Sequence, residues 1–160
     1  MENVGTLHTV AQIAIALIGF SGIVIVFGSR SATWTAEESM RLYALLAPSF
    51  TALLCSFVPI LLAIEISNSD AVWRLSNAVL GVLHTANLGW FLINRWGAKA
   101  TIGQRVNGVF GMIVIAAHAL AALALIPWYE FVFILGLLQQ LYIGVHNFLL
   151  LFRPDARGAT

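Results

Sequence analysis

Three histidines, His84, His118 and His146, lie inside long runs of uncharged residues, and imidazole is the side chain best suited to bind a metal or move a proton near neutral pH. Ionisable groups in such runs are costly in a membrane, so they often serve a function. His84 and His118 lie near the middles of consecutive runs, which favours a pair of axial ligands to a b-type haem. Glycines on the same helical faces, Gly81 and either Gly108 or Gly111, would leave room for a porphyrin edge. Haem bound by His84 and His118 is therefore one hypothesis.

Amide side chains accompany these histidines at helical spacing. Because successive residues lie about 100° apart around a helix, Asn77 shares a face with His84, and Asn107 shares one with His118. The simplest interpretation is that neutral histidines hydrogen-bond to amides across helices, a contact worth about 0.6 kcal/mol on average in membranes. The alternative is a pathway for an ion, a proton or a small polar solute, lined by Asn77, His84, Asn107, His118, Gln139, Gln140, His146 and Asn147.

Constellations typical of catalysis or metal binding are missing from the uncharged runs. These runs contain no Asp or Glu, so no carboxylate within them can orient a histidine as a general base or complete a metal site. Cys55 is the single cysteine, which excludes an intramolecular disulfide and a CxxC pair. We therefore expect no enzymatic activity, no metal site and, outside the haem hypothesis, no cofactor.

Five uncharged runs must position these side chains, at residues 3–29, 42–64, 75–94, 106–129 and 131–152. Each holds the roughly twenty mostly apolar residues that a helix needs to cross about 30 Å of hydrocarbon. The composition agrees, with 60% hydrophobic and 9% charged residues, against about 25% charged in soluble domains. The sequence predicts an all-α polytopic membrane protein. It forms one transmembrane domain over residues 1–160, a compact bundle of five transmembrane helices at approximately 5–28, 38–65, 73–94, 105–127 and 130–152.

The positive charges indicate how this bundle is oriented. Lys and Arg in short connections tend to stay on the cytoplasmic side. With helices that alternate in direction, Arg74 falls on one side and the other seven of the eight basic residues fall on the opposite side. We therefore expect the N-terminus outside and the C-terminus in the cytoplasm, in the lipid of a bacterial inner membrane. The basic residues are too scattered for a phosphate-binding patch, so nucleic acid is not an expected partner. The seven are Arg30, Arg41, Arg95, Lys99, Arg105, Arg153 and Arg157.

Small residues recur at multiples of four positions, the spacing that lets helix backbones approach closely in a membrane. Gly81 and Gly89 belong to one such stripe, Gly136 and Gly144 belong to another, and Gly111 lies on the face of a third helix that carries a histidine. We expect these five glycines to be helix-packing positions. Because a five-helix bundle of this size has little interior, we also expect some polar faces to find partners in a homo-oligomer.

Three functions remain open at this point. The first is a small non-enzymatic membrane protein that forms a homo-oligomeric channel or transport path for an ion or small polar solute, lined by the His, Asn and Gln faces. The second is a haem-binding electron-transfer protein. The third is a membrane-anchor or accessory subunit whose polar faces dock a larger membrane complex. We favour the first interpretation.

Overall fold

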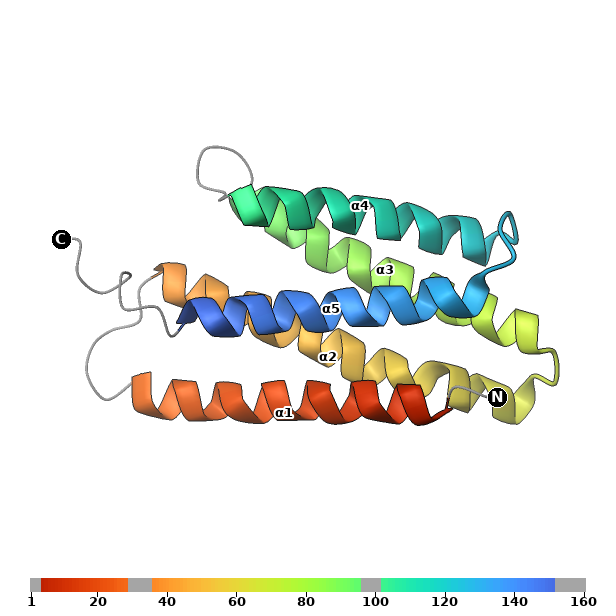
Figure 1. Ribbon diagram of the computed structural model, residues 1–160, viewed down its shortest axis with the longest axis horizontal. Helices are drawn as coiled ribbons and strands as arrows, with labels where there is room; N and C mark the ends of the chain where they lie inside the picture. Colours follow the sequence, from red (N-terminus) through yellow and green to blue (C-terminus); the bar gives the residue numbers. More distant parts are fainter. Residues whose placement is uncertain (1–3, 29–35, 96–101, 152–160) are drawn as a thin grey trace.

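The computed structural model describes residues 4–28, 36–95 and 102–151, and every regular element within these residues is an α-helix. The prediction of an all-α protein is thus confirmed for the described part of the chain. The helices are α1 (Val4–Gly28), α2 (Ala36–Glu65), α3 (Ser69–Arg95), α4 (Ile102–Ala122) and α5 (Tyr129–Leu151). Successive helices run in opposite directions, as Figure 1 shows.

The last helix, α5, lies at the centre of this arrangement. It packs against each of the other four helices, with the α1–α2 pair on one side and the α3–α4 pair on the other (Figure 1). Within the described residues, α2 and α4 do not contact each other. The two helix pairs are therefore joined by α5 and by the contact between α2 and α3, which leaves space between α2 and α4.

Four of the five helices are long and apolar enough to cross a membrane. The candidate spans are Val4–Val26, Glu38–Glu65, Ile102–Ala122 and Tyr129–Leu151. The described helix α3 is as long as the others but less apolar, because it contains charged residues in its first turns and several amide and hydroxyl side chains along its length. Composition therefore establishes a helical membrane protein, whereas the predicted count of five spans does not follow from composition.

Basic residues gather at one end of the bundle, which we call the basic end. It is formed by the starts of α2 and α4 and the finishes of α1, α3 and α5 (Figure 1). Arg41 and Arg105 lie near the starts of α2 and α4, and Arg95 is the last residue of α3. The remaining residues of the predicted cytoplasmic set, Arg30, Lys99, Arg153 and Arg157, lie outside the described residues. We call the opposite end the far end. Arg74 lies there, and its Nε donates to the carbonyl of Ala122 over 3.2 Å.

The helix α4 ends at Ala122, five residues before the predicted boundary at 127. Its carbonyls are satisfied by the chain that follows: the amide of Leu125 donates to Leu120 O over 2.8 Å and that of Ala124 donates to Ala121 O over 3.1 Å. This is the hydrogen-bond pattern of a Schellman motif, in which one residue adopts a left-handed conformation. Ala124 does so with φ of 59°. Pro127 follows and keeps the residue before it from resuming a helical conformation.

Pro48 inside α2 leaves a backbone carbonyl of that helix free to contact a side chain of α5. Pro48 has no amide hydrogen, so the carbonyl of Ala44 loses its usual partner four residues along the helix. Asn147 of α5 lies within 3.5 Å of this carbonyl through Nδ2, which also donates to Ile143 O over 2.9 Å. The helices α2 and α5 can approach because Gly144 has no side chain: a Cβ there would lie 2.7 Å from Oγ of Ser49. This contact fixes the position of Asn147.

Candidate functional site

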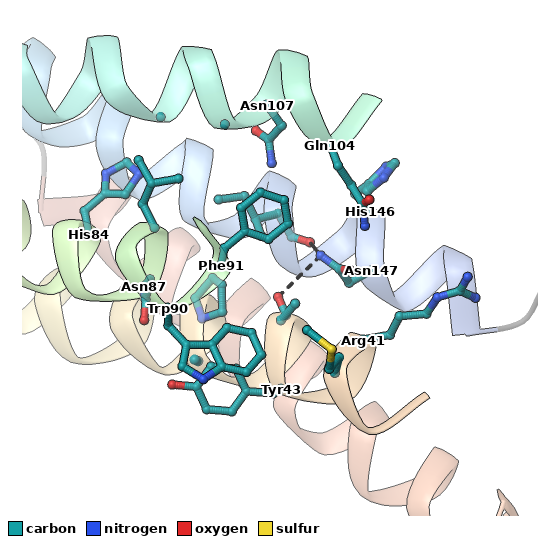
Figure 2. A pocket seen from close by; sticks show the side chains of 18 residues that line it. Arg41, Tyr43, His84, Asn87, Trp90, Phe91, Gln104, Asn107, His146 and Asn147 are labelled. Atoms are coloured by element: carbon teal, nitrogen blue, oxygen red, sulfur yellow. Dashed lines mark hydrogen bonds between the residues drawn. The ribbon is translucent and has the colours of Figure 1, made fainter. Parts of the chain in front are cut away.

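A cavity of about 70 Å³ lies between α2, α3, α4 and α5 in the half of the bundle nearer the basic end. Figure 2 shows Asn107 on α4, His84 on α3 and Asn147 on α5 around this space. One ordered water needs about 10–15 Å³ on this measure, so the cavity has room for roughly five waters or a solute with about five non-hydrogen atoms. Its lining is Met40, Arg41, Tyr43, Ala44, Ala47, Pro48, His84, Asn87, Leu88, Trp90, Phe91, Gln104, Asn107, Gly108, Gly111, Ile143, His146 and Asn147.

Aromatic and charged side chains surround the part of the cavity nearest the basic end. The rings of Tyr43 and Trp90 have centroids 3.9 Å apart and join α2 to α3. Arg41 extends across to α5, where its Nη1 donates to the carbonyl of Leu150 over 2.9 Å. His146 is partly buried and stacks on Tyr142, with 6.1 Å between ring centroids. The contacts of Tyr43 and Arg41 join α2 to α3 and to α5 around the part of the cavity nearest the basic end.

At its inner end the cavity reaches His84, which is 1% exposed. Gly111 of α4 also lines this end, and the position of a Cβ on Gly111 would be 3.3 Å from Nε2 of Gln139 and 3.6 Å from Nε2 of His84. Because Gly111 has no side chain, the inner end of the cavity borders the imidazole of His84 and lies next to the buried amide of Gln139. A methyl group at this position would occupy the junction between them.

A hydrogen-bonded bridge lies beside this junction. Nδ2 of Asn87 in α3 donates to Oγ1 of Thr51 in α2 over 3.0 Å and to Oε1 of Gln140 in α5 over 3.2 Å. Because the NH₂ group of Asn87 donates to Gln140, the amide of Gln140 must present its oxygen to Asn87 and its nitrogen elsewhere. That orientation leaves Nε2 of Gln140 as a donor directed away from the bridge.

Toward the far end, the two central histidines and Asn77 continue the polar interior. The rings of His84 and His118 have centroids 6.0 Å apart and an interplanar angle of 67°. Nδ1 of His118 lies 2.7 Å from Oδ1 of Asn77, whose Nδ2 donates to the carbonyls of Trp73 over 2.8 Å and Tyr129 over 2.7 Å. Two carbonyl acceptors fix which end of the Asn77 amide is nitrogen, so Oδ1 is the atom that faces His118. Nδ1 of His118 must then carry the hydrogen.

We call Asn77, His118, His84, Gln139 and Gln140 the polar row. All five side chains are at most 3% exposed. Several of their polar atoms make no hydrogen bond with the described residues: Nδ1 of His84, Nε2 of His118, both polar atoms of Gln139 and Nε2 of Gln140. Leaving a buried polar group unpaired costs about 1–3 kcal/mol each. Each of the other four members of the row thus has an unpaired atom, whereas Asn77 at the far end is fully bonded.

The structure divides the eight residues predicted to line a pathway into two groups. His84, Asn107, His146 and Asn147 line the cavity. Asn77, His118, Gln139 and Gln140 are buried deeper in the bundle. Both groups face the interior of a single chain, so neither group needs a second copy of the chain to bring its members together.

The five glycines predicted at helix contacts differ in their surroundings. A Cβ on Gly136 would lie 2.5 Å from Cε1 of His118 and closer still to Nε2, and one on Gly81 would lie 3.1 Å from Cβ of His118. Gly111 and Gly144 also face neighbouring helices, as described above. By contrast, a Cβ on Gly89 would meet no atom within 4 Å. Four of the five glycines thus lie where two helices approach, and three of these four border the polar row.

Three polar residues of the site were missed by the sequence interpretation: Asn87, Thr51 and Gln104. Asn87 follows His84 by three positions and so lies close to the same helical face, a signal that was present in the sequence. Thr85, which directly follows His84, is exposed. The hydroxyl of Thr85 donates to the carbonyl of Gly81 in its own helix over 2.7 Å, so this side chain needs no partner in the interior.

The two central histidines do not face a common point in this structure. Nε2 of His118 is directed at the backbone of Gly136 in α5, and Nε2 of His84 lies near Gly111 in α4. One haem iron bound by both atoms would require at least one ring to rotate and the helices to separate, because the cavity of about 70 Å³ has room for only about five non-hydrogen atoms. Haem binding stays a prediction that a visible spectrum tests.

Comparison of the chain with family models, with curated proteins and with solved structures found no match. A function must therefore be inferred from the cavity and the polar row themselves.

Proposed function

We propose that this chain is a non-enzymatic integral membrane protein whose helix bundle provides a transport path for an ion or a small polar solute. The path would begin in the cavity near the basic end. It would continue through His84 and the middle of the polar row to His118 and Asn77. The far end of the row reaches the carbonyl of Tyr129, the first residue of α5.

The observation that carries this proposal is a set of buried, unpaired polar atoms that adjoins a cavity. A bundle that needed only apolar packing would gain stability if hydrophobic residues replaced these side chains, because an unsatisfied buried amide is destabilising. Gln139 uses neither of its polar atoms within the described residues, and it lies beside Gly111, which lines the cavity. Such an arrangement favours an occupant that the side chains bind and release.

The same proposal assigns α3 to the membrane as a fifth span. It packs between α2 and α4, which are both candidate spans, and it runs antiparallel to each of them (Figure 1). Its polar side chains Asn77 and His84 are buried in the interior, so they lower its hydropathy without facing lipid. If the basic end lies in the cytoplasm of a bacterium, the cavity would face the cytoplasm. The hydrogen bonds of Asn77, which join α3 to α4 and α5 at the far end, would then lie toward the outside.

Association of several copies is a separate proposal that this path does not require. In a homo-oligomer each protomer would carry its own polar row, since the row lies inside one chain. In the alternative role as an anchor or accessory subunit, the row would stay closed and the protein would be found with a larger membrane complex. Transport by the purified chain separates these two possibilities.

The transport proposal is tested by flux into liposomes that contain the purified chain, with Gly111→Ala as the blocking variant. The added methyl group would occupy the junction between the cavity, Gln139 and His84, so we expect the protein-dependent flux to fall at least about tenfold, which corresponds to about 1.4 kcal/mol. Gly89→Ala is the matched control, because the same substitution meets no atom within 4 Å there.

Both substitutions replace glycine by alanine inside a helix, which favours helix formation by up to about 1 kcal/mol. A difference in flux between them therefore reports the junction rather than helix propensity. Equal flux through the two variants, or no flux through the folded wild-type protein for any ion or solute tried, would overturn the proposal.

A further inference from the structure

The unpaired atoms of the polar row also indicate what kind of molecule would occupy it, an inference that rests on the transport function proposed above. Nε2 of Gln140 is a donor, because its Oε1 accepts from Asn87. Nε2 of His118 is an acceptor in the neutral ring, because Nδ1 carries the hydrogen that Asn77 Oδ1 accepts. Gln139 offers one donor and one acceptor. The interior thus presents donors and acceptors together.

A mixed set of this kind fits a neutral occupant better than an ion. Beside Gly111 a cation would face the NH₂ group of Gln139, whereas an anion would face the amide oxygen of the same side chain. Among the described residues that line the cavity, Arg41 is the one charged side chain, and it lies near the basic end. A desolvated ion deeper in the row would have no opposite charge to stabilise it.

Size limits the occupant further. The cavity of about 70 Å³ has room for about five non-hydrogen atoms, judged by the volume that one ordered water requires. The junction at Gly111 is the point where such a molecule would meet Gln139 Nε2 and His84 together. A planar molecule that carries both NH groups and a carbonyl oxygen could satisfy donors and acceptors on opposite sides of this junction.

We propose that a small neutral solute of the urea or simple amide class binds at the inner end of the cavity, where His84 and Gln139 meet beside Gly111. The NH₂ group of Gln139 donates to the carbonyl oxygen of the solute. The NH groups of the solute donate to the amide oxygen of Gln139. Ions are excluded because the row offers them no compensating charge.

The test compares urea with ions in liposomes that contain the full-length chain. Stopped-flow light scattering follows urea and water entry, and ion-selective and pH-sensitive dyes follow potassium, chloride and protons. Gln139→Met keeps a side chain of similar length but removes one donor and one acceptor, so we expect protein-dependent urea flux to fall roughly tenfold. Gln12→Met is the matched control, because Gln12 is exposed on α1 and lies outside the polar row.

The outcomes distinguish this inference from the transport proposal. Urea flux that Gln139→Met lowers and Gln12→Met leaves unchanged supports the inference. Flux of potassium, chloride or protons without urea overturns the inference and leaves the transport proposal standing. Passage of water alone also overturns it, since water would then be the molecule that pairs with the row. No flux of any kind through the folded protein overturns both, and a circular dichroism spectrum of each variant verifies folding.

Discussion

At the far end of the polar row Asn77 uses both polar atoms of its amide, whereas in the middle of the row Gln139 uses neither. Both side chains are buried amides in neighbouring parts of one helix bundle. Asn77 joins α3 to α4 and α5 through hydrogen bonds, so its amide is part of the structure that closes the far end. Gln139 adjoins the cavity and has no partner among the described residues. Burial of a polar side chain therefore does not by itself mark a binding site; unused hydrogen-bonding capacity next to a cavity does.

The largest expected effect on stability comes from Asn77→Leu. The substitution would leave the carbonyl of Tyr129 and Nδ1 of His118 buried without their partner, and we expect a loss of about 3 kcal/mol in the free energy of unfolding. Unfolding by SDS in mixed micelles measures the change. Asn94→Leu is the control, since Asn94 is exposed and bonds within its own helix. Similar losses in both variants would contradict a structural role for Asn77.

A smaller loss of stability is expected for Gly136→Ala, on the opposite side of His118. The new methyl group would overlap the imidazole ring, so His118 or α5 must move, and overpacking of this kind costs about 2 kcal/mol. The same unfolding assay applies, with Gly89→Ala as the comparison. If Gly136→Ala were as stable as Gly89→Ala, the close contact of α4 with α5 at His118 would be wrong.

Gln139→Met is expected to change stability in the other direction. Because neither polar atom of Gln139 has a partner among the described residues, an apolar side chain there should raise the free energy of unfolding by about 1 kcal/mol. This gain would accompany the loss of urea flux predicted above. A destabilised Gln139→Met variant would mean that the amide has a structural partner, which would remove the contrast with Asn77.

Ala124→Gly tests the far end at a position distant from the row. Ala124 adopts a left-handed conformation after α4, which favours glycine, so we expect a gain of roughly 0.5 kcal/mol in unfolding free energy. Transport should not change, because the substitution leaves the cavity lining intact. Thermal unfolding and the flux assay measure the two quantities, and a changed flux would indicate that the turn after α4 is coupled to the path.

The smallest expected effect is in the visible spectrum. With the two Nε2 atoms directed at different glycines, we expect protein purified in mild detergent after expression with ample haem to show no Soret band. A Soret band that disappears in His84→Ala and His118→Ala would instead support the haem hypothesis and a different conformation of the polar row.

The helices and their inward faces follow from the sequence, whereas the cavity does not. Uncharged runs of spanning length and the 100° spacing of residues are local properties, so the pattern predicts where helices lie and which side of α3 carries Asn77 and His84. The cavity depends on α2 and α4 standing apart on either side of α5, and no local pattern encodes that separation. The end of α4 at Ala122 was also missed, because the turn-forming capacity of Leu123 to Ile126 does not appear in their apolar character.

Individual partners within the site were equally hard to predict. Asn87 bonds to two other helices, and Thr85, two positions earlier, faces outward. Both residues are small or medium-sized and polar, and both lie within one turn of His84. Their difference arises from which helices pack on each side of α3, which only the tertiary arrangement decides.

The central position of α5 has a consequence for how the protein is made. During synthesis α1 to α4 leave the ribosome before α5, yet α5 supplies Gln139, Gln140 and Asn147, together with the Tyr129 carbonyl that accepts from Asn77. Until it inserts, the polar faces of α3 and α4 lack their neighbours in the bilayer. A chain that stops before residue 129 should therefore be recognised by membrane quality control and degraded, and the order of the helices makes the last insertion the step that completes the interior.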